Sequence, residues 1–352
     1  MSILVINSGS SSIKSALYGP DLTETRAARV TGIGTDAGAV LSLGETETPL
    51  DAPDHAAAFA AILAALGETE ALIAVAHRVV HGGTKLTAPA RLTPETIAVI
   101  EECIPLAPLH NPPIVSGIRA MQTLRPDLPQ FASFDTAFHA GQAPSQTAYA
   151  LPEAWRRLGL RRYGFHGLSY AGMVDAFGAD LPERLLAFHL GAGCSLCAIH
   201  RGRSVATTMG YSPVSGPTMA TRAGDVDAMA VLRMAEEVGI EATGEILNKQ
   251  SGLLGLAGVR DMRRLLSMDT AKAKFAVEHF VATIVRGAGG LIAVMGGVDA
   301  FAFTGGIGEN SDTIRDQIMA QLRWIGDRPV HVIPAQEERQ IARDAYRLID
   351  GA

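Results

Sequence analysis

The sequence has few cysteines, no excess of positive charge and no unbroken hydrophobic run long enough to cross a membrane. Its 352 residues include three cysteines, Cys103, Cys194 and Cys197. That is too few for a disulfide framework, and we expect a reducing, cytoplasmic location. Thirty Lys and Arg residues against 36 Asp and Glu residues give a formal charge of −6. This balance argues against a nucleic acid or an anionic membrane as partner, but an anionic small molecule stays open.

The apolar segments are short or interrupted. Residues 1–14 have a four-residue apolar run and no basic start, so we expect no signal peptide. Residues 56–66 are roughly half the length of a membrane span, and residues 287–308 contain glycine pairs and Asp299. With 47% hydrophobic and 19% charged residues, the sequence predicts a soluble globular protein of about two domains, at roughly 150 residues each.

Two similar hairpins lie about half a chain apart. Residues 3–6 and 13–18 read as strands around the polar turn 7–12, and residues 185–190 and 196–203 read as strands around the turn 191–195. Gly9 and Gly193 are 184 residues apart. We interpret the two hairpins as a duplicated domain with a cleft between the copies.

Strands and helices alternate along the rest of the chain, which is typical of an α/β protein. The expected helices are at about 54–66, from Thr93-Pro94-Glu95 with Thr93 as N-cap, at 225–239, 241–249 and 271–296, from about Ser311, and at the C-terminal end. The expected strands are 71–80, 131–138, 300–303 and one within 331–349, with a proline-rich loop at 104–115 and a glycine turn at 305–308. We expect the last helix to fold back on the first domain.

The first hairpin turn has the composition of a phosphate site. Residues 7–12 offer closely spaced backbone N–H groups and hydroxyls, and Lys14 follows. Glycine lets the backbone approach a ligand, and successive amides form a nest for an anion. A lone turn of this kind is more often an ordinary hairpin, and it does not match the P-loop pattern. The repeat at 191–195 and a third glycine turn at 304–310 favour phosphate binding.

Residues 77–83 end an apolar strand with two histidines, an arginine and two glycines. The HxxxH spacing lacks the helix and the glutamate of a zinc protease, so zinc is disfavoured. Arg78 could hold a carboxylate or phosphate through two hydrogen bonds, and a surface ion pair is an equal alternative. Cys194 and Cys197 form a lone CxxC, which we interpret as structural.

Three further segments place histidine or aspartate beside large apolar side chains, which indicates a shared pocket. They are 109–113, 134–139 and 163–167. A fourth segment, 221–225, adds Arg222 in a loop with glycine.

Together these segments resemble the acetate/propionate kinase (acetokinase) family. The likeness rests on NSGSSSIK (7–14), HRVVHGG (77–83), APLHNPP (107–113), FDTAFH (134–139), RRYGFHG (161–167), HLGAG (189–193), TRAGDVD (221–227), SGLLG (251–255), FTGGIGENS (303–311) and IPAQEERQIARDAYRL (333–348). The resemblance implies the duplicated actin/hexokinase/Hsp70-like ATPase fold, which is ribonuclease H-like, with ATP and Mg²⁺, or Mn²⁺, in the inter-domain cleft of a homodimer. We place the domains at 1–145 with 338–352, and at 146–337.

The resemblance also implies a role for each matching position. The catalytic set is Asp135, His166 and Arg222. The acceptor set is Arg78 for the carboxylate, Val80, Leu109, Phe165 and Pro213 around the methyl end, and His110 close by. The nucleotide set is Lys14, Ser10, Ser12, His189, Leu190, Gly191, Ala192, Gly193, Asp261, Met262, Arg263, Gly305, Gly306, Ile307, Gly308 and Glu309. The metal set is Asn7 and Glu337.

The implied reaction is reversible phosphoryl transfer from ATP to acetate, giving ADP and acetyl phosphate. The barrier to phosphoryl transfer comes mostly from bringing negative charges together and from aligning the reacting groups. A carboxylic acid with a pKa of about 4 to 5 is ionised at pH 7 and needs no general base. We therefore expect direct in-line transfer, with Asp135 orienting its neighbours or holding the water shell of the metal rather than removing a proton. Propionate or butyrate as acceptor, an ATP-binding regulator on the same fold, and a degenerate paralogue remain alternatives. Ala192, where the family has asparagine, and the altered loop 212–223 motivate the last.

Overall fold

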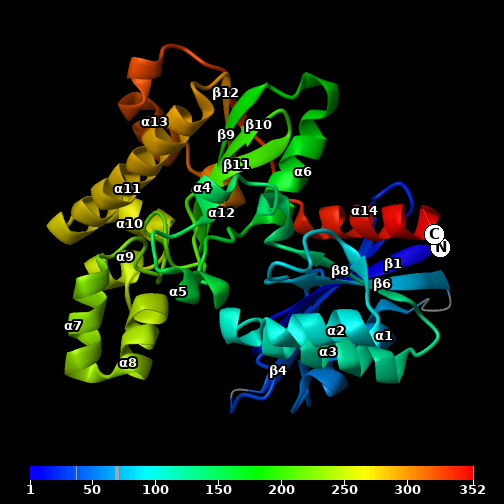
Figure 1. Ribbon diagram of the computed structural model, residues 1–352. Helices are drawn as coiled ribbons and strands as arrows, with labels where there is room; N and C mark the ends of the chain where they lie inside the picture. Colours follow the sequence, from blue (N-terminus) through cyan, green and yellow to red (C-terminus); the bar gives the residue numbers. More distant parts are fainter. Residues whose placement is uncertain (37, 68–70, 352) are drawn as a thin grey trace. The chain divides into compact units, whose positions relative to one another are not determined.

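The chain divides into two units, unit 1 (Met1–Ala140 with Gln336–Ala352) and unit 2 (Gly141–Ala335). The structure is a computed structural model that describes residues 1–36, 38–67 and 71–351, coloured along the chain in Figure 1. The predicted domain boundaries, at 145/146 and 337/338, lie a few residues from these divisions and stay predictions. Ala352, the end of the predicted first domain, lies outside the described residues.

Unit 1 is built on a sheet of eight strands in the order β5-β4-β3-β2-β1-β6-β8-β7. The strands are β1 (Ser2–Ser8), β2 (Ser12–Tyr18), β3 (Glu24–Thr31), β4 (Ala39–Leu43), β5 (Thr46–Leu50), β6 (Leu72–Val79), β7 (Ala90–Arg91) and β8 (Gln130–Phe134). β1 pairs antiparallel with β2 and parallel with β6, and β6 pairs parallel with β8. The carboxyl ends of β1, β6 and β8 therefore meet at one edge of the sheet.

Helices cover both faces of this sheet. They are α1 (His55–Leu66), α2 (Pro94–Glu102), α3 (Asn111–Leu124) and α14 (Glu337–Asp350), with 3-10 turns at Ile104–Leu106 and Ala137–His139. Figure 1 shows α14 on one face and α1 to α3 on the other. α14 packs on β1, β6 and β8, which is the expected return of the last helix to the first unit. Asp54 caps α1, and Thr93 caps α2 with Pro94 in its first turn, as expected.

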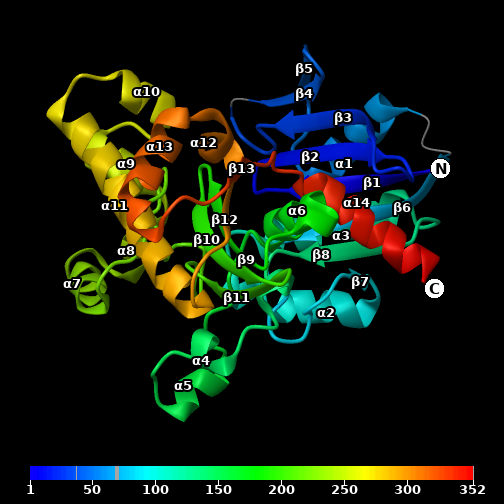
Figure 2. The ribbon, with the colours of Figure 1, turned by 90° about the horizontal axis from the view of Figure 1, so that it is seen from above.

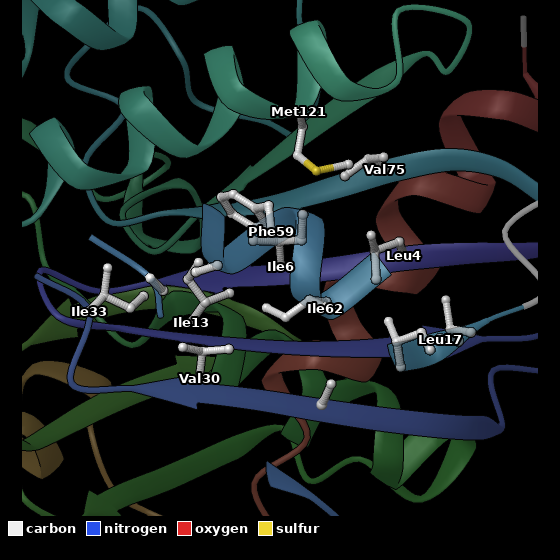
Figure 3. Packing of buried hydrophobic residues seen from close by; sticks show 14 of the residues in the cluster. Leu4, Ile6, Ile13, Leu17, Val30, Ile33, Phe59, Ile62, Val75 and Met121 are labelled. Atoms are coloured by element: carbon white, nitrogen blue, oxygen red, sulfur yellow. The ribbon is translucent and has the colours of Figure 1, made fainter. Parts of the chain in front are cut away.

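The core of unit 1 lies between the sheet and helices α1 and α3. Phe59 and Ile62 of α1 and Met121 of α3 are fully buried and point onto the apolar side chains of the strands, among them Ile6 and Ile13 (Figure 3). Burying such side chains stabilises the fold by roughly 1.5–3 kcal/mol each. This core holds the strand ends of the site in place.

Unit 2 has a five-stranded sheet with the order β11-β10-β9-β12-β13. Its strands are β9 (Arg184–Leu190), β10 (Cys194–His200), β11 (Arg203–Thr207), β12 (Ala300–Thr304) and β13 (Val330–Val332). β9 pairs antiparallel with β10 and parallel with β12, which pairs parallel with β13. This order repeats β3-β2-β1-β6-β8 of unit 1, so the duplication that the two hairpins predicted is present in the strand topology.

The helices of unit 2 lie before, between and after these strands along the chain, and Figure 2 shows α11 beside the strands and α7 at the periphery of the unit. They are α4 (Pro144–Thr147), α5 (Glu153–Arg157), α6 (Gly167–Phe177), α7 (Ala228–Val238), α8 (Ile240–Glu245), α9 (Gly252–Ala257), α10 (Met262–Ser267), α11 (Ala271–Met295), α12 (Gly305–Asn310) and α13 (Asp312–Gln321), with 3-10 turns at Gly178–Asp180 and Arg323–Ile325 and a π turn at Ile246–Gln250. Within the described chain, α11 alone has the length and apolar composition of a membrane span. It packs on β10, α9 and α13 and buries Phe280 and Ile284.

Three elements differ from the sequence-based expectation. The proline-rich segment 104–115 is not a loop throughout, because α3 begins at Asn111 and its prolines lie in the first turn, where missing N–H groups cost nothing. The expected strand 131–138 ends at Phe134. The glycine turn 305–308 is the helix α12, entered at Gly305 with a φ of 79°. A Cβ there would lie 2.8 Å from the Leu190 carbonyl oxygen, so the close approach to β9 requires glycine.

Candidate active site

In unit 1, two carboxylates hold Arg78 at the carboxyl end of β6. Its Nε and Nη2 donate to the two oxygens of Asp135 at 3.0 and 2.7 Å, and its Nη1 lies 3.3 Å from Oε2 of Glu337. Parallel pairing of β6 and β8 sets Val79 opposite Phe134, so Asp135 follows directly and its N–H donates to the Val79 carbonyl. Glu337 begins α14. The fold thus gathers three predicted site residues from distant parts of the chain.

Burial strengthens the electrostatic interactions between Arg78 and its two carboxylates. The Arg78 and Asp135 side chains are 19% and 3% exposed. Burial by itself lowers the pKa of Arg78, but Asp135 and Glu337 more than offset this and raise it above its ordinary value, so the guanidinium stays charged. Burial raises the pKa of the Asp135 carboxyl, and Arg78 opposes that rise. Asp135 therefore orients Arg78 through a bidentate, charge-assisted contact.

α3 brings His110 toward this cluster. His110 precedes the first residue of the helix and lowers the pKa of Asp135 electrostatically. The next residue, Asn111, is fully buried and holds the turn after β6, because its Nδ2 donates to the His81 carbonyl at 3.0 Å and its Oδ1 accepts from the His81 N–H at 3.3 Å. The polar half of the 109–113 motif is thus structural as well as directed to the site.

The predicted apolar wall residues have contrasting exposure. In unit 1, Val80 is half-buried and Leu109 is 53% exposed. In unit 2, Phe165 is 1% exposed and Pro213 is half-buried. Their shared role around the acceptor's methyl end stays a prediction.

The first glycine turn is tied by its backbone. The Gly9 N–H donates to the Ser12 carbonyl at 2.7 Å, and Nε2 of His55 is 2.8 Å from the Gly9 carbonyl oxygen, which can only accept. His55 was missed by sequence reasoning, because it begins α1, 46 residues away, and belongs to no motif. The predicted ligands on this hairpin are Asn7, Ser10, Ser12 and Lys14.

The matching turn of unit 2, residues 191–193, faces two stacked histidines. The rings of His166 and His189 lie 4.0 Å apart at 19°. A Cβ on Gly193 would lie 3.2 Å from Nε2 of His166 and 3.3 Å from Nη1 of Arg222. His166 and Arg222 therefore both direct a nitrogen atom at this glycine turn, which is an arrangement suited to a phosphoryl group.

Arg222 lies in the loop that follows β11. Its Nη1 donates to the Pro213 carbonyl at 3.1 Å, and its own carbonyl accepts from the Met219 N–H at 3.2 Å. Gly224 has a φ of 78°, and a Cβ there would lie 2.7 Å from the Gly216 carbonyl oxygen. The loop is closed on itself around the arginine.

A cavity of about 430 Å³ opens beside the same turn. Its lining includes seven of the predicted nucleotide residues, Gly191, Ala192, Asp261, Met262, Arg263, Gly306 and Ile307. It also includes Ala220, Thr221, Arg260, Asn310 and Ser311, which sequence reasoning did not select. Thr221, Asn310 and Ser311 lie inside the motifs 221–227 and 303–311 without having been assigned a role, and Arg260 directly precedes the predicted residue Asp261.

Glu309 has a structural contact rather than a place in the cavity lining. Its Oε1 accepts from the N–H of Gly305 at 2.8 Å and from the N–H of Ala335 at 2.9 Å. The carboxylate thereby joins α12 to the segment after β13. His189, Leu190, Gly193, Gly305 and Gly308 are also outside the lining that the described residues form, and the nucleotide roles of all six stay predictions.

The structure also describes the HxxxH and CxxC motifs, which the sequence did not favour as metal or redox sites. Nε2 of His77 lies 2.8 Å from Oε1 of Gln130, and burial lowers its pKa to about 4. No group of three or more His, Cys, Asp or Glu residues suited to a metal is found in the described ranges. All three cysteines are free and buried, and burial raises the pKa of Cys194 and of Cys197 to about 12.

Comparison with known proteins gives the family. The model of the acetokinase family matches residues 2–343. The chain belongs to the acetokinase family. An acetate kinase of Rhodopseudomonas palustris is 41% identical over 392 aligned residues, covering 99% of this chain and 98% of the relative. An acetate kinase of Deinococcus deserti is also 41% identical, covering 100% and 92%.

Solved structures of the same family share the fold. A propionate kinase from Francisella tularensis has a TM-score of 0.93 at 32% identity and covers 97% of this chain and 98% of its own. An acetate kinase from Porphyromonas gingivalis has a TM-score of 0.90 at 34% identity and covers 99% of both. The Lmo2764 protein of Listeria monocytogenes matches at 0.52 with 12% identity, so that likeness concerns the fold alone. The fold is the duplicated actin/hexokinase-like α/β fold that the resemblance implied.

Proposed function

We propose that the protein catalyses reversible phosphoryl transfer from ATP to acetate, forming ADP and acetyl phosphate. The full-length match to relatives named acetate kinase, at 41% identity, carries this proposal. The chemistry of the site supports it. Arg78 offers a cation for a carboxylate, and His166 and Arg222 offer nitrogen atoms beside a glycine turn.

Arg78 would hold the acceptor carboxylate with its second edge. Asp135 occupies the edge formed by Nε and Nη2. Nη1 has only Glu337, at 3.3 Å, as carboxylate neighbour within the described chain. A substrate carboxylate that replaces Glu337 beside Nη1 exchanges one negative charge for another, so the total charge around Arg78 stays the same. Because the acceptor is already ionised, Asp135 needs to orient Arg78 and does not need to remove a proton.

The transferring phosphoryl group would lie against the 191–193 turn, with the nucleotide in the adjoining 430 Å³ cavity. Phosphoryl transfer passes through a loose transition state in which charge spreads over the equatorial oxygens. Donors fixed in advance at those oxygens lower the barrier without reorganisation. His166 and Arg222 would be these donors, and direct in-line transfer needs no covalent enzyme intermediate.

Asn7 and Glu337 fit a magnesium ion by their chemistry. Mg²⁺ prefers oxygen ligands and is commonly held by one or two carboxylates, water and substrate phosphates. Asn7 is the last residue but one of β1, Glu337 begins α14, and α14 packs on β1. A bound Mg²⁺ would neutralise phosphate charge. Isothermal titration with Mn²⁺ in the presence of ATP tests the pair, since Glu337→Gln should weaken metal binding while nucleotide binding remains.

The homodimer and the cytoplasmic location are part of the same proposal. α7 buries none of its side chains, and Met229, Leu232 and nearby Ile240 are 69%, 55% and 83% exposed. An exposed apolar helix face of this kind is suited to a partner surface. Light scattering of the native protein and of the Leu232→Glu variant measures whether the protein is a dimer and whether α7 contributes to the interface. A dimer that the substitution leaves intact would remove α7 from the interface.

Propionate is the second candidate acceptor, and the propionate kinase structure at TM-score 0.93 favours it. One methylene in an apolar pocket is worth only about 1–3 kcal/mol, so the preference has to be measured. The assay is hydroxamate formation from Mg-ATP and hydroxylamine with acetate, propionate and butyrate. Product with acetate supports the proposal, and the rates rank the acids. No product with any acid, from protein that binds ATP, would contradict it and favour a regulator or a degenerate paralogue.

A further inference from the structure

The backbone of His166 has a conformation that residues other than glycine rarely adopt. Its φ is 58°, in the left-handed region, and it stands at the N-cap position of α6 without using its side chain as a cap. A histidine in this conformation costs free energy that the surroundings must offset. The imidazole instead points toward β10, where it lies within hydrogen-bond distance of Ser195.

Two buried hydroxyl groups continue from the imidazole. Nδ1 of His166 lies 2.8 Å from Oγ of Ser195, and that oxygen lies 2.6 Å from the hydroxyl of Tyr170. Ser195 and Tyr170 are both fully buried. Tyr170 lies one helical turn after His166, and its N–H donates to the His166 carbonyl, so both side chains reach the same serine.

The direction of these hydrogen bonds follows from the nitrogen that faces the 191–193 turn. Nε2 of His166 can donate to an anionic phosphoryl oxygen only if it carries a hydrogen, and in the neutral ring Nδ1 is then an acceptor. Nδ1 would accept from the hydroxyl of Ser195, and the Ser195 oxygen would accept from the phenol of Tyr170. Burial raises the pKa of Tyr170 well above its ordinary value, so the phenol keeps its hydrogen.

We propose that Tyr170 and Ser195 are positioning residues that hold His166 as the tautomer with its hydrogen on Nε2. That nitrogen faces the 191–193 turn beside Arg222, so it donates to the transferring phosphoryl group instead of opposing it with a lone pair. The inference rests on the proposed function for the anionic group that meets Nε2, and on the geometry of unit 2 for the contacts that hold the imidazole.

A second, parallel contact supplies the matched control. Nδ1 of His189 lies 2.8 Å from Oγ of Ser169, which is on α6. The two stacked histidines are thus each held by a serine on a different element. Ser169→Ala removes the hydroxyl that holds His189 and keeps the one that holds His166.

The first test needs no activity. ¹⁵N NMR of the full chain labelled in its histidines reports which ring nitrogen carries the hydrogen, and His166→Gln assigns the signal. We expect His166 in the Nε2–H form in the native protein and in Ser169→Ala, and a mixture of tautomers in Ser195→Ala. A native His166 with its hydrogen on Nδ1 would overturn the proposal.

The second test is kinetic. Ser195→Ala should lower kcat at least about tenfold, and Tyr170→Phe about 2- to 10-fold, with little change in KM for ATP. In a His166→Gln background the same substitutions should have no further effect, because they act through His166. An equal loss in that background would assign the two residues a merely structural role. If no acid is phosphorylated but His166 carries its hydrogen on Nε2, the proposed function fails and the tautomer assignment stands.

Discussion

The two units hold their candidate functional side chains in opposite ways. In unit 1, Arg78 is enclosed by carboxylates, with Asp135 on one edge and Glu337 near the other. In unit 2, Arg222 donates to a backbone carbonyl, and His166 rests on a serine hydroxyl. A cation paired with buried carboxylates also supports the fold, whereas the contacts of Arg222 and His166 named here are to neutral oxygen atoms. Substitutions in the two units should therefore separate stability from activity.

The largest combined effect is expected for Arg78→Ala. It leaves Asp135 and Glu337 without their cation, and an uncompensated buried charge costs about 3–5 kcal/mol. Both the free energy of unfolding, from urea titration, and the hydroxamate rate should fall. Arg119→Ala, an exposed arginine of the same unit paired with Glu101, should cost under about 1 kcal/mol. Equal losses from the two substitutions would remove the distinction between buried and exposed pairs.

Arg222→Ala should affect activity far more than stability. Loss of one fixed donor to a transition-state oxygen costs about 10²- to 10³-fold in kcat, while the Pro213 carbonyl and the Met219 sulfur that contact Arg222 are neutral. We expect the urea midpoint to stay within the range seen for Arg157→Ala, whose side chain is 76% exposed. ATP binding, measured by titration calorimetry, should persist. A wild-type kcat in Arg222→Ala would exclude the arginine from the transfer step.

Acid should weaken unit 1 through its buried histidines. Burial lowers the pKa of His77 from 6.5 to about 4, and that of His81 likewise. Below pH 6.5 the unfolded chain takes up protons that the folded chain refuses, so the free energy of unfolding falls as pH falls toward 4. The loss is about 2 kcal/mol per histidine between pH 6.5 and 5.

Urea titrations at both pH values measure this loss, and His77→Gln should reduce it by about one histidine's share. Gln122→Ala, at an exposed position of α3 without a titratable side chain, is the control and should leave the dependence of unfolding free energy on pH unchanged. A pH slope that His77→Gln does not alter would show that this imidazole does not control acid stability.

The same contrast explains what sequence reasoning reached and what it missed. Patterns of apolar residues and turns located β1, β2, β9 and β10, because alternation and glycine are local signals. They missed the start of α3 at Asn111, since two prolines read as a loop unless they occupy a first turn. Partners contributed by another element were out of reach. His55 on Gly9, Asp135 on Arg78 and Ser195 on His166 depend on strand order, which no local pattern records.

The smallest expected effect concerns the cavity of unit 2. Ala192 lines it and is exposed, and its carbonyl accepts from the Ala220 N–H at 3.2 Å, which fixes the backbone there. A carboxamide at this position could add one hydrogen bond to the nucleotide. Ala192→Asn should therefore tighten ATP binding about 2- to 10-fold, measured by titration calorimetry. Ala192→Val adds bulk without a polar atom and separates hydrogen bonding from contact area. If asparagine leaves the affinity unchanged, the side chain at position 192 does not limit nucleotide binding.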